Sequence, residues 1–174
     1  MRLPAGVFTR ALEMHRDERG CLTEIFRSAW QTGIEPVQWN AISSAAGVMR
    51  GVHVHLRHDD YAVLIQGRAS VGLCDLRPDS PTHGLAALVE HSGEHLTVLG
   101  IPPGVAHGFY FHEPSLLIQA VNADYRPEDE LGCHWADPGL GIPWPVGSAR
   151  TSHRDAAAPP LPALLAKLAA QKRA

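Results

Sequence analysis

The sequence predicts an all-β fold in which short antiparallel strands form a barrel or a sandwich. From residue 37 onward, β-branched and apolar segments recur at intervals of roughly eight to twelve residues, a spacing typical of such folds. Turn-forming residues separate these segments, and the chain contains 16 Gly and 14 Pro. So many turn residues favour short strands over long helices.

The expected strands follow one another along the chain. Residues 7–13 form an expected edge strand, and the turn signal Asp17-Glu18-Arg19-Gly20 precedes a mixed run at 21–27. The stronger candidates are residues 37–42, 47–56, 61–66, 69–76, 85–90, 96–101, 108–111 and 116–122. Turns at 66–68, 77–81 and 102–104 contain Gly or Pro where the chain must reverse.

The C-terminal part differs in composition from the strands. After Tyr125 the chain is rich in Pro, Gly and Trp, and residues 163–174 form an Ala/Leu/Lys segment of high helix propensity. We expect a short surface helix there. No repeat or low-complexity linker divides the chain. The prediction is therefore a single domain over residues 1–174, with a core at about 16–158 and a tail at about 159–174.

Composition excludes several classes of protein. Hydrophobic residues make up 45% and charged residues 19%, which is unlike a disordered chain. The net charge of -3 offers no broad cationic field, so we expect neither nucleic acid nor membrane binding. Cys21, Cys74 and Cys133 lack a C-x-x-C spacing and are expected to be reduced thiols. Without an apolar leader or a membrane-span run, a cytoplasmic protein is predicted.

Two histidine motifs stand out. In an extended strand His53 and His55 share one face, with Val52, Val54 and Leu56 on the other. Two hydrogen-bonded strand histidines are the plain alternative to a functional pair. The second motif is Pro102-Pro103-Gly104-Val105-Ala106-His107, in which a rigid turn directs a histidine onto the next strand.

Together, H-x-H and P-x-G-x-x-H resemble the two half-motifs of the cupin superfamily. The resemblance implies a cupin-type antiparallel β-barrel (jelly roll) with short peripheral helices. It also implies that these histidines lie inside one cavity.

Longer blocks resemble a particular family. In order, the following blocks are similar to the signature of the dTDP-4-dehydrorhamnose 3,5-epimerase family: Asp17-Glu18-Arg19-Gly20 with Glu24, Gln38-Trp39-Asn40, Arg50-Gly51-Val52-His53, Asp75-Leu76-Arg77 with Ser80-Pro81-Thr82, Pro103 to Phe109, Tyr125-x-Pro127-x-x-Glu130, Trp135-Ala136-Asp137-Pro138, Ile142-Pro143-Trp144-Pro145, and Ser152-His153-Arg154-Asp155. The similarity spans about residues 16 to 160.

The resemblance implies epimerisation beside the ketone of a nucleotide-diphosphate sugar, a 4-keto-6-deoxy hexose, by a homodimer that uses neither metal nor nicotinamide cofactor. His53 matches the general base, and Asp155 matches the carboxylate that orients it. The positions that match substrate-binding residues are Arg19, Glu24, Gln38, Asn40, Arg50, His107 and Tyr125.

Three positions depart from the family pattern: His55 stands where the family usually has glutamine, and two further replacements affect the catalytic residues. Counted from Gly67, the family lysine of K-x-V-x-x-x-x-G is assigned to Tyr61, and the proton-donating tyrosine falls on Gln119. Glutamine has no ionisable proton, so the usual acid is missing and Gln119 is expected only to contact substrate. Tyr61 is then the candidate replacement acid.

Two alternatives remain open at this stage. His53, His55 and His107 are three imidazoles of the kind that metal-binding cupins use, with Asp59, Asp60 or Tyr61 near the position of a fourth ligand. The second alternative is a non-catalytic homologue that binds a nucleotide sugar in the same cleft but lacks the proton-donating acid.

Overall fold

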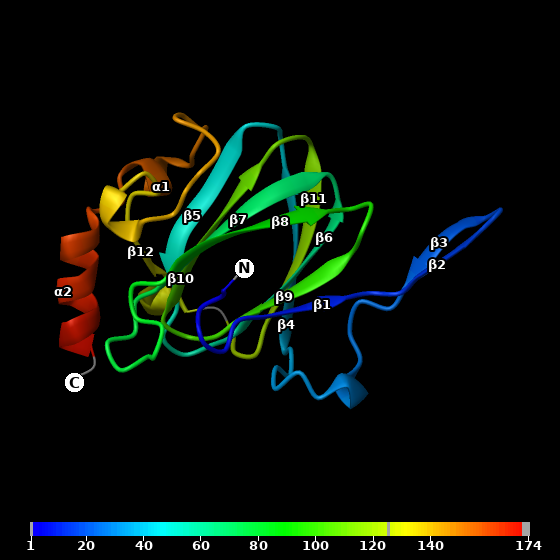
Figure 1. Cartoon of the computed structure of the whole chain (residues 1–174), viewed down its shortest axis with the longest axis horizontal. Coiled ribbons are helices and arrows are strands. Elements are labelled where there is room, and N and C mark those ends of the chain that lie inside the picture. Colours follow the sequence, from blue (N-terminus) through cyan, green and yellow to red (C-terminus); the bar gives the residue numbers. More distant parts are fainter. Residues whose placement is uncertain (1, 125, 172–174) are drawn as a thin grey trace.

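The computed structural model describes residues 2–124 and 126–171, and within them antiparallel strands dominate (Figure 1). Tyr125 lies outside the described residues. One five-stranded sheet has the order β1 (Phe8–Ala11), β9 (Thr97–Ile101), β6 (Asp60–Gln66), β11 (Ser115–Val121) and β4 (Gln38–Ser44). The other has the order β12 (Leu131–Gly132), β5 (Val48–Val54), β10 (Val105–Phe111), β7 (Arg68–Asp75) and β8 (Ala86–Ser92). The all-β prediction is confirmed.

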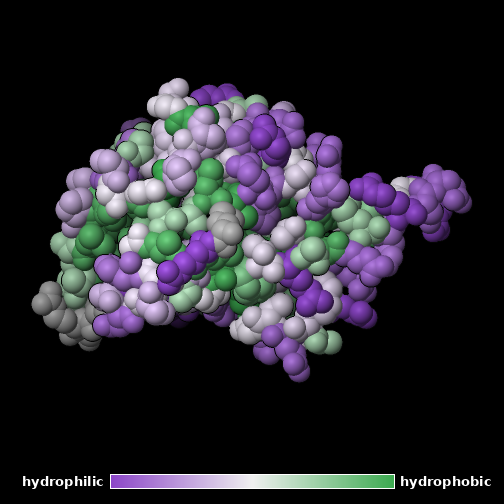
Figure 2. Space-filling view, in the orientation of Figure 1, coloured by the Kyte–Doolittle hydropathy of each residue, from purple (hydrophilic) through white to green (hydrophobic). Residues whose placement is uncertain are grey.

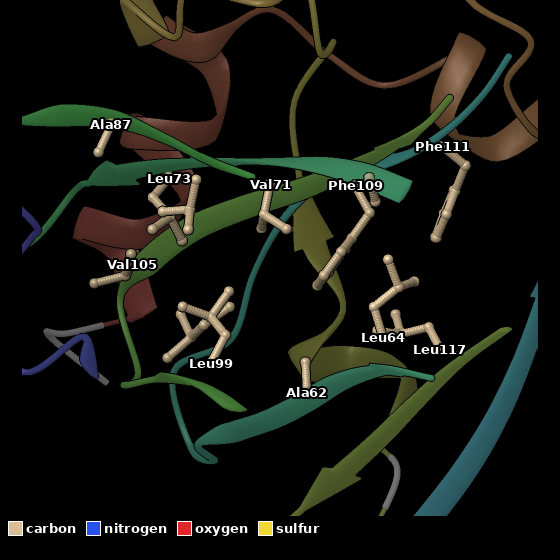
Figure 3. Close-up of a cluster of buried hydrophobic side chains, with 13 residues drawn as sticks. Ala62, Leu64, Val71, Leu73, Ala87, Leu99, Val105, Phe109, Phe111 and Leu117 are labelled. Carbon is tan, nitrogen blue, oxygen red and sulfur yellow. The ribbon is translucent and has the colours of Figure 1, made fainter. Parts of the chain in front are cut away.

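The two sheets meet through their inward-facing side chains. Figure 3 shows this cluster, in which Val71, Leu73 and Phe109 of one sheet face Leu64 and Leu99 of the other. Period-2 alternation along each strand separates the inner from the outer side chains. The sheets therefore enclose an apolar core that continues toward the cavity described below.

The outer faces of the sheets are covered by segments outside them. Against the second sheet pack Trp135, Leu140 of a 3-10 helix (Pro138–Leu140), and Leu161 and Leu164 of helix α2 (Leu161–Gln171). Against the first sheet packs the segment that contains a 3-10 helix at Ser28–Trp30 and Ile34. These layers give both sheets two buried faces over much of their area.

All eight stronger strand predictions are confirmed, with small differences at their ends. The largest concerns β10, which begins at Val105 because the Pro102–Gly104 turn leads directly into it. The predicted edge strand is β1. The run at 21–27 is a strand only in β3 (Gly20–Thr23), which pairs with the unpredicted β2 (Met14–Asp17). The C-terminal helix is confirmed as α2, although its Leu161 and Leu164 are buried.

The β2–β3 hairpin projects away from the sheets, and its tip is hydrophilic (Figures 1 and 2). Two further short elements, a 3-10 helix (Pro127–Asp129) and helix α1 (His153–Ala156), lie near β5. Among residues 2–124 and 126–171, no helix is both long and apolar enough to span a membrane.

Candidate active site

A cavity of about 750 Å³ opens between the two sheets. Its wall comes from β4, β5, β10 and β11 and from the segment that leads into α1. The polar and charged lining residues are Asn40, Arg50, His53, His55, His107, Gln119, Glu130, Arg150, Thr151, Ser152, Arg154 and Asp155. Residues far apart in the chain thus converge on one pocket.

Gly51 allows β5 to approach β10 closely beside the cavity. Its φ is +113°, and a Cβ there would lie 2.7 Å from the Gly108 Cα. Only glycine tolerates both that conformation and that contact. The pairing shifts by one residue at this point, because His107 faces His53 while Gly108 faces Gly51. Such a bulge re-aims the side chains that follow it.

His53 and His55 both line the cavity, whereas Val52 and Val54 are buried on the opposite face of β5. The predicted alternation is therefore confirmed, and the histidine face is the one that points into the cavity.

His53 and Asp155, called the outer pair below, meet across 2.8 Å between Nε2 and Oδ1. The Ser152 hydroxyl caps α1 by accepting from the Asp155 amide at 3.1 Å, which places the carboxylate. The other oxygen of Asp155 accepts from the Gly51 amide at 3.3 Å. Burial alone would raise the pKa of Asp155, but the hydrogen bond and charge of His53, the Gly51 amide and the charge of Arg154 outweigh it and lower the pKa to about 2.

An ionised Asp155 fixes the tautomer of His53. A carboxylate only accepts hydrogen bonds, so the bond to Asp155 requires a proton on Nε2 of His53 and leaves the lone pair on Nδ1, which lies 3.4 Å from Arg154 Nη2. The Arg154 guanidinium lies beside the ring, with Nη2 2.8 Å from Nε2, and its Nη1 donates to Glu130 Oε2 at 3.3 Å. His53 is partly exposed, with 22% of its side-chain surface accessible. Its ring is therefore open to a molecule in the cavity.

His55, Asp60, His107 and Gln119 are called the inner cluster below. His55, His107 and Gln119 line the cavity, and Asp60 contacts all three. His55, Asp60 and His107 are all buried. The Gln119 amide donates to Asp60 Oδ1 at 2.5 Å, while Asp60 Oδ2 lies 3.8 Å from His55 Nε2 and 3.6 Å from His107 Nε2.

Burial governs the charge state of the inner cluster. It lowers the pKa of His55 to about 4, assisted by the charges of His107 and His58, and it lowers the pKa of His107 to about 4. Burial also raises the pKa of Asp60, against the opposing influence of the neighbouring histidines and Gln119. Both imidazoles are therefore neutral near pH 7.

The assignment of Tyr61 as a catalytic acid is wrong. Tyr61 points to the opposite face of β6 from Asp60 and Ala62, where it is fully buried against Phe26 and Trp39. Its hydroxyl donates to the Ile25 carbonyl at 2.6 Å, and burial raises its pKa to about 12. Counted again, K-x-V-x-x-x-x-G ending at Gly67 begins at Asp60, the residue that does belong to the inner cluster.

The expected substrate-binding residues divide into two groups. Asn40, Arg50, His107 and Gln119 line the cavity, and the Arg50 side chain is held by Ser44 Oγ at 2.9 Å and the Ser43 carbonyl at 3.1 Å.

Arg19, Glu24 and Gln38 do not line the cavity. Arg19 pairs with Asp17 in the projecting hairpin, with 83% of its side chain exposed, and Glu24 lies 3.4 Å from Arg27. Gln38 donates to Asn40 Oδ1 at 3.1 Å from the start of β4. Tyr125 is outside the described residues.

Sequence reasoning assigned no role to Glu130, Arg150 or Arg154, and it considered Asp60 only as a fourth metal ligand; all four lie at or beside this cavity. Glu130 and Arg154 belong to sequence blocks that resemble the family signature, so those blocks could have identified them as site residues. Asp60 was not matched to the family lysine because the motif K-x-V-x-x-x-x-G was counted back from Gly67 with an error of one residue. No local pattern marks Arg150, whose guanidinium donates to the Ala46 carbonyl.

The candidate metal ligands that lie close together differ from the predicted set of His53, His55 and His107. The ligand atoms of His55, Asp60 and His107 lie within 4.8 Å of one another, as do those of His55, His58 and Asp129. Among the described residues, His53 belongs to neither group, because it bonds to Asp155.

Comparison with known proteins agrees with this architecture. The family model of dTDP-4-dehydrorhamnose 3,5-epimerase matches residues 4–163. The dTDP-4-dehydrorhamnose 3,5-epimerase of Shigella flexneri is 35% identical over 150 residues, which cover 80% of this chain and 82% of that protein.

Two solved structures superpose over nearly the whole chain. One is dTDP-6-deoxy-D-glucose-3,5-epimerase RmlC from Legionella pneumophila Philadelphia 1 in complex with dTDP-4-keto-L-rhamnose, at 32% identity and a TM-score of 0.86, covering 94% of this chain and 92% of that one. The other is ChmJ, a 3'-monoepimerase from Streptomyces bikiniensis in complex with dTDP-quinovose, at 27% identity and a TM-score of 0.86, covering 95% and 88%. The likeness confirms the predicted cupin-type fold. The chain belongs to the dTDP-4-dehydrorhamnose 3,5-epimerase family and is an enzyme of that type.

Proposed function

We propose that the protein epimerises a dTDP-4-keto-6-deoxyhexose by removing a proton from a carbon next to the ketone, with His53 as the base. The observation that supports this most directly is the 2.8 Å contact between His53 and Asp155 at the wall of a cavity of about 750 Å³. A cavity of this size suits a nucleotide sugar in part or in whole.

The proposed step uses both nitrogens of His53. Nδ1 takes the proton from carbon, while the Nε2 proton stays on the hydrogen bond to Asp155, whose negative charge stabilises the imidazolium that forms. The ketone oxygen gains negative charge as the enolate develops, so hydrogen-bond donors must surround it. Asn40 and Gln119 offer amide donors on the same cavity wall.

Arg50 and Arg150 suit the diphosphate. Both guanidiniums belong to the lining, and arginine binds phosphate oxygens in a bidentate manner. The complexes of the Legionella and Streptomyces relatives contain a dTDP-sugar, which supports the same ligand class for this cavity.

Neither Gln119 nor Tyr61 can supply the acid that returns a proton to the carbon. Gln119 stands where the family places its acid and has no ionisable proton. Tyr61 is excluded by its position outside the cavity.

The predicted homodimer is retained as a proposal. Large apolar side chains are exposed on the projecting hairpin, on β4 and directly before it, since Leu22 is 64%, Trp39 44% and Val37 62% exposed. Apolar groups of this size on a sheet edge and an arm are typical of a surface that another chain covers. Light scattering on the purified protein measures the assembly directly.

The decisive experiment is solvent exchange. The protein is incubated with dTDP-4-keto-6-deoxyglucose in heavy water, and deuterium beside the ketone is followed by NMR. We expect wild type and His95→Asn, a substitution of an exposed histidine outside the cavity, to exchange at equal rates. His53→Asn should lose exchange about 100-fold or more while binding dTDP normally. Wild-type binding without any exchange would instead identify a non-catalytic nucleotide-sugar binder.

A further inference from the structure

The inner cluster has the donor set and burial of a metal site. His55 comes from the end of β5, Asp60 from the start of β6 and His107 from β10, so the set joins the two sheets. Their exposures are 4%, 2% and 3%. Buried groups of this polarity are normally paired or bound to a cation.

The hydrogen bonds of the two histidines orient their free nitrogens toward Asp60. His107 Nδ1 lies 3.2 Å from the Val105 carbonyl, and His55 Nδ1 lies 3.3 Å from the Asp129 carbonyl. A carbonyl only accepts, so in each neutral ring Nδ1 holds the proton and Nε2 has the lone pair. Metal-binding histidines are typically fixed in this way by a partner at the other ring nitrogen.

The three inward atoms converge without a hydrogen bond between them. Asp60 Oδ2 is 3.8 Å from His55 Nε2 and 3.6 Å from His107 Nε2, both longer than a hydrogen bond. Two lone pairs and a carboxylate oxygen thus face one another. Ligand atoms about 2.0 to 2.1 Å from a tetrahedral ion lie about 3.3 to 3.4 Å apart. The two distances from Asp60 exceed that separation by only a few tenths of an ångström, and all three ligand atoms lie within 4.8 Å of one another.

We propose that His55, Asp60 and His107 bind one divalent transition-metal ion, with its remaining coordination positions open to the cavity. Two imidazoles and one carboxylate are a set used for Zn²⁺ and Fe²⁺ at catalytic centres. Gln119 fixes the carboxylate through Asp60 Oδ1. An ion there acts as a Lewis acid on an oxygen of a molecule in the cavity.

The second group, His55, His58 and Asp129, is a weaker candidate. The Asp129 carboxylate already accepts from the amides of Leu56 and Arg57 at 3.0 and 3.2 Å, and it lies 3.3 Å from His58. Of the second group only His55 lines the cavity among the described residues, whereas His55 and His107 of the proposed set both line it. These groups are used in holding the 3-10 helix against β5.

The test uses Co²⁺ on the whole protein after removal of metal with a chelator. We expect one Co²⁺ per chain, with visible absorption bands of an ordered nitrogen and oxygen site that Zn²⁺ abolishes by displacement. Asp60→Asn and His107→Gln should each weaken Co²⁺ binding by about 100-fold or more, whereas Asp60→Glu, which keeps the carboxylate, should restore part of it.

His53→Asn is the matched control, since it removes a cavity histidine outside the set, and it should bind Co²⁺ like wild type. Thermal unfolding and dTDP titration establish that each variant is folded. The proposal fails if wild type binds no Co²⁺ at one per chain, if the Asp60 and His107 variants bind as wild type does, or if His53→Asn abolishes binding. Because Co²⁺ binding is read without the sugar, its outcome is separate from that of the exchange experiment.

Discussion

The outer pair and the inner cluster share one cavity and contain the same residue types, yet they differ in charge state. His53 is 22% exposed and holds an ionised Asp155 through a short hydrogen bond. His55, His107 and Asp60 are buried at longer distances from one another. Burial penalises charge, whereas a close opposite partner favours it.

The difference shows how one pocket can separate two tasks. The outer pair has a lone pair on Nδ1, a hydrogen-bonded carboxylate and access to a bound molecule, which are the requirements of a base. The inner cluster has two neutral imidazoles and a carboxyl group directed at one point, which are the requirements of a ligand set. Environment, rather than residue type, assigns these roles.

The largest expected effect comes from breaking the outer pair. In Asp155→Asn the side chain can donate to Nε2, which favours the other tautomer and removes the charge that stabilises the imidazolium. We expect the deuterium exchange rate to fall about 10² to 10⁴-fold, with dTDP affinity unchanged. Glu128→Gln, which neutralises an exposed carboxylate, serves as the control. Exchange at the wild-type rate in Asp155→Asn would remove the outer pair from the mechanism.

The inner cluster should instead control stability at mildly acid pH in chelator-treated protein. The unfolded histidines protonate near pH 6.5, but folded His55 and His107 do so only near pH 4, so stability present above pH 6.5 is lost as the pH falls. From pH 6.5 to about 5, each histidine should account for about 2 kcal/mol of lost unfolding free energy. Asp60 opposes this trend, because its raised pKa lets the folded state take up a proton first.

The contribution of His107 to this loss is measured by comparing the urea unfolding of wild type and of His107→Gln from pH 6.5 to about 5. We expect a flatter pH dependence in His107→Gln. The pKa of Asp155 is lowered, so the stability from its ionisation is lost only between about pH 4 and pH 2, and Asp155→Asn should run parallel to wild type near pH 6. Equal slopes in His107→Gln and wild type would contradict the assigned neutral state.

Much of the fold follows from local patterns. Period-2 alternation and turn residues predicted the eight main strands, and the Ala/Leu/Lys composition predicted α2. The short elements β12 and α1 were not predicted, because two or four residues leave no periodic pattern and their place depends on β5 and on the Ser152 cap.

The site was predictable only in part. His53 and Asp155 are 102 residues apart, so their contact was expected from the recognised blocks and not from spacing. Arg19 also lies in such a block, but it stands on the projecting β2–β3 hairpin, where it pairs with Asp17 and its side chain is 83% exposed. Asp60 and Tyr61 show the sensitivity of a strand, because a shift of one residue moves a side chain from the cavity to the opposite face.

Tyr61→Phe tests that one-residue distinction. The hydroxyl donates to the Ile25 carbonyl at 2.6 Å within an apolar cluster, so its removal should cost about 1 kcal/mol of unfolding free energy. It should leave the exchange rate and Co²⁺ binding unchanged, because the ring faces Phe26 and Trp39 and not the cavity. Asp60→Asn, at the adjacent position on the other face, should remove Co²⁺ binding. A large loss of exchange in Tyr61→Phe would return this phenol to the chemistry and would require β6 to turn its other face toward the substrate.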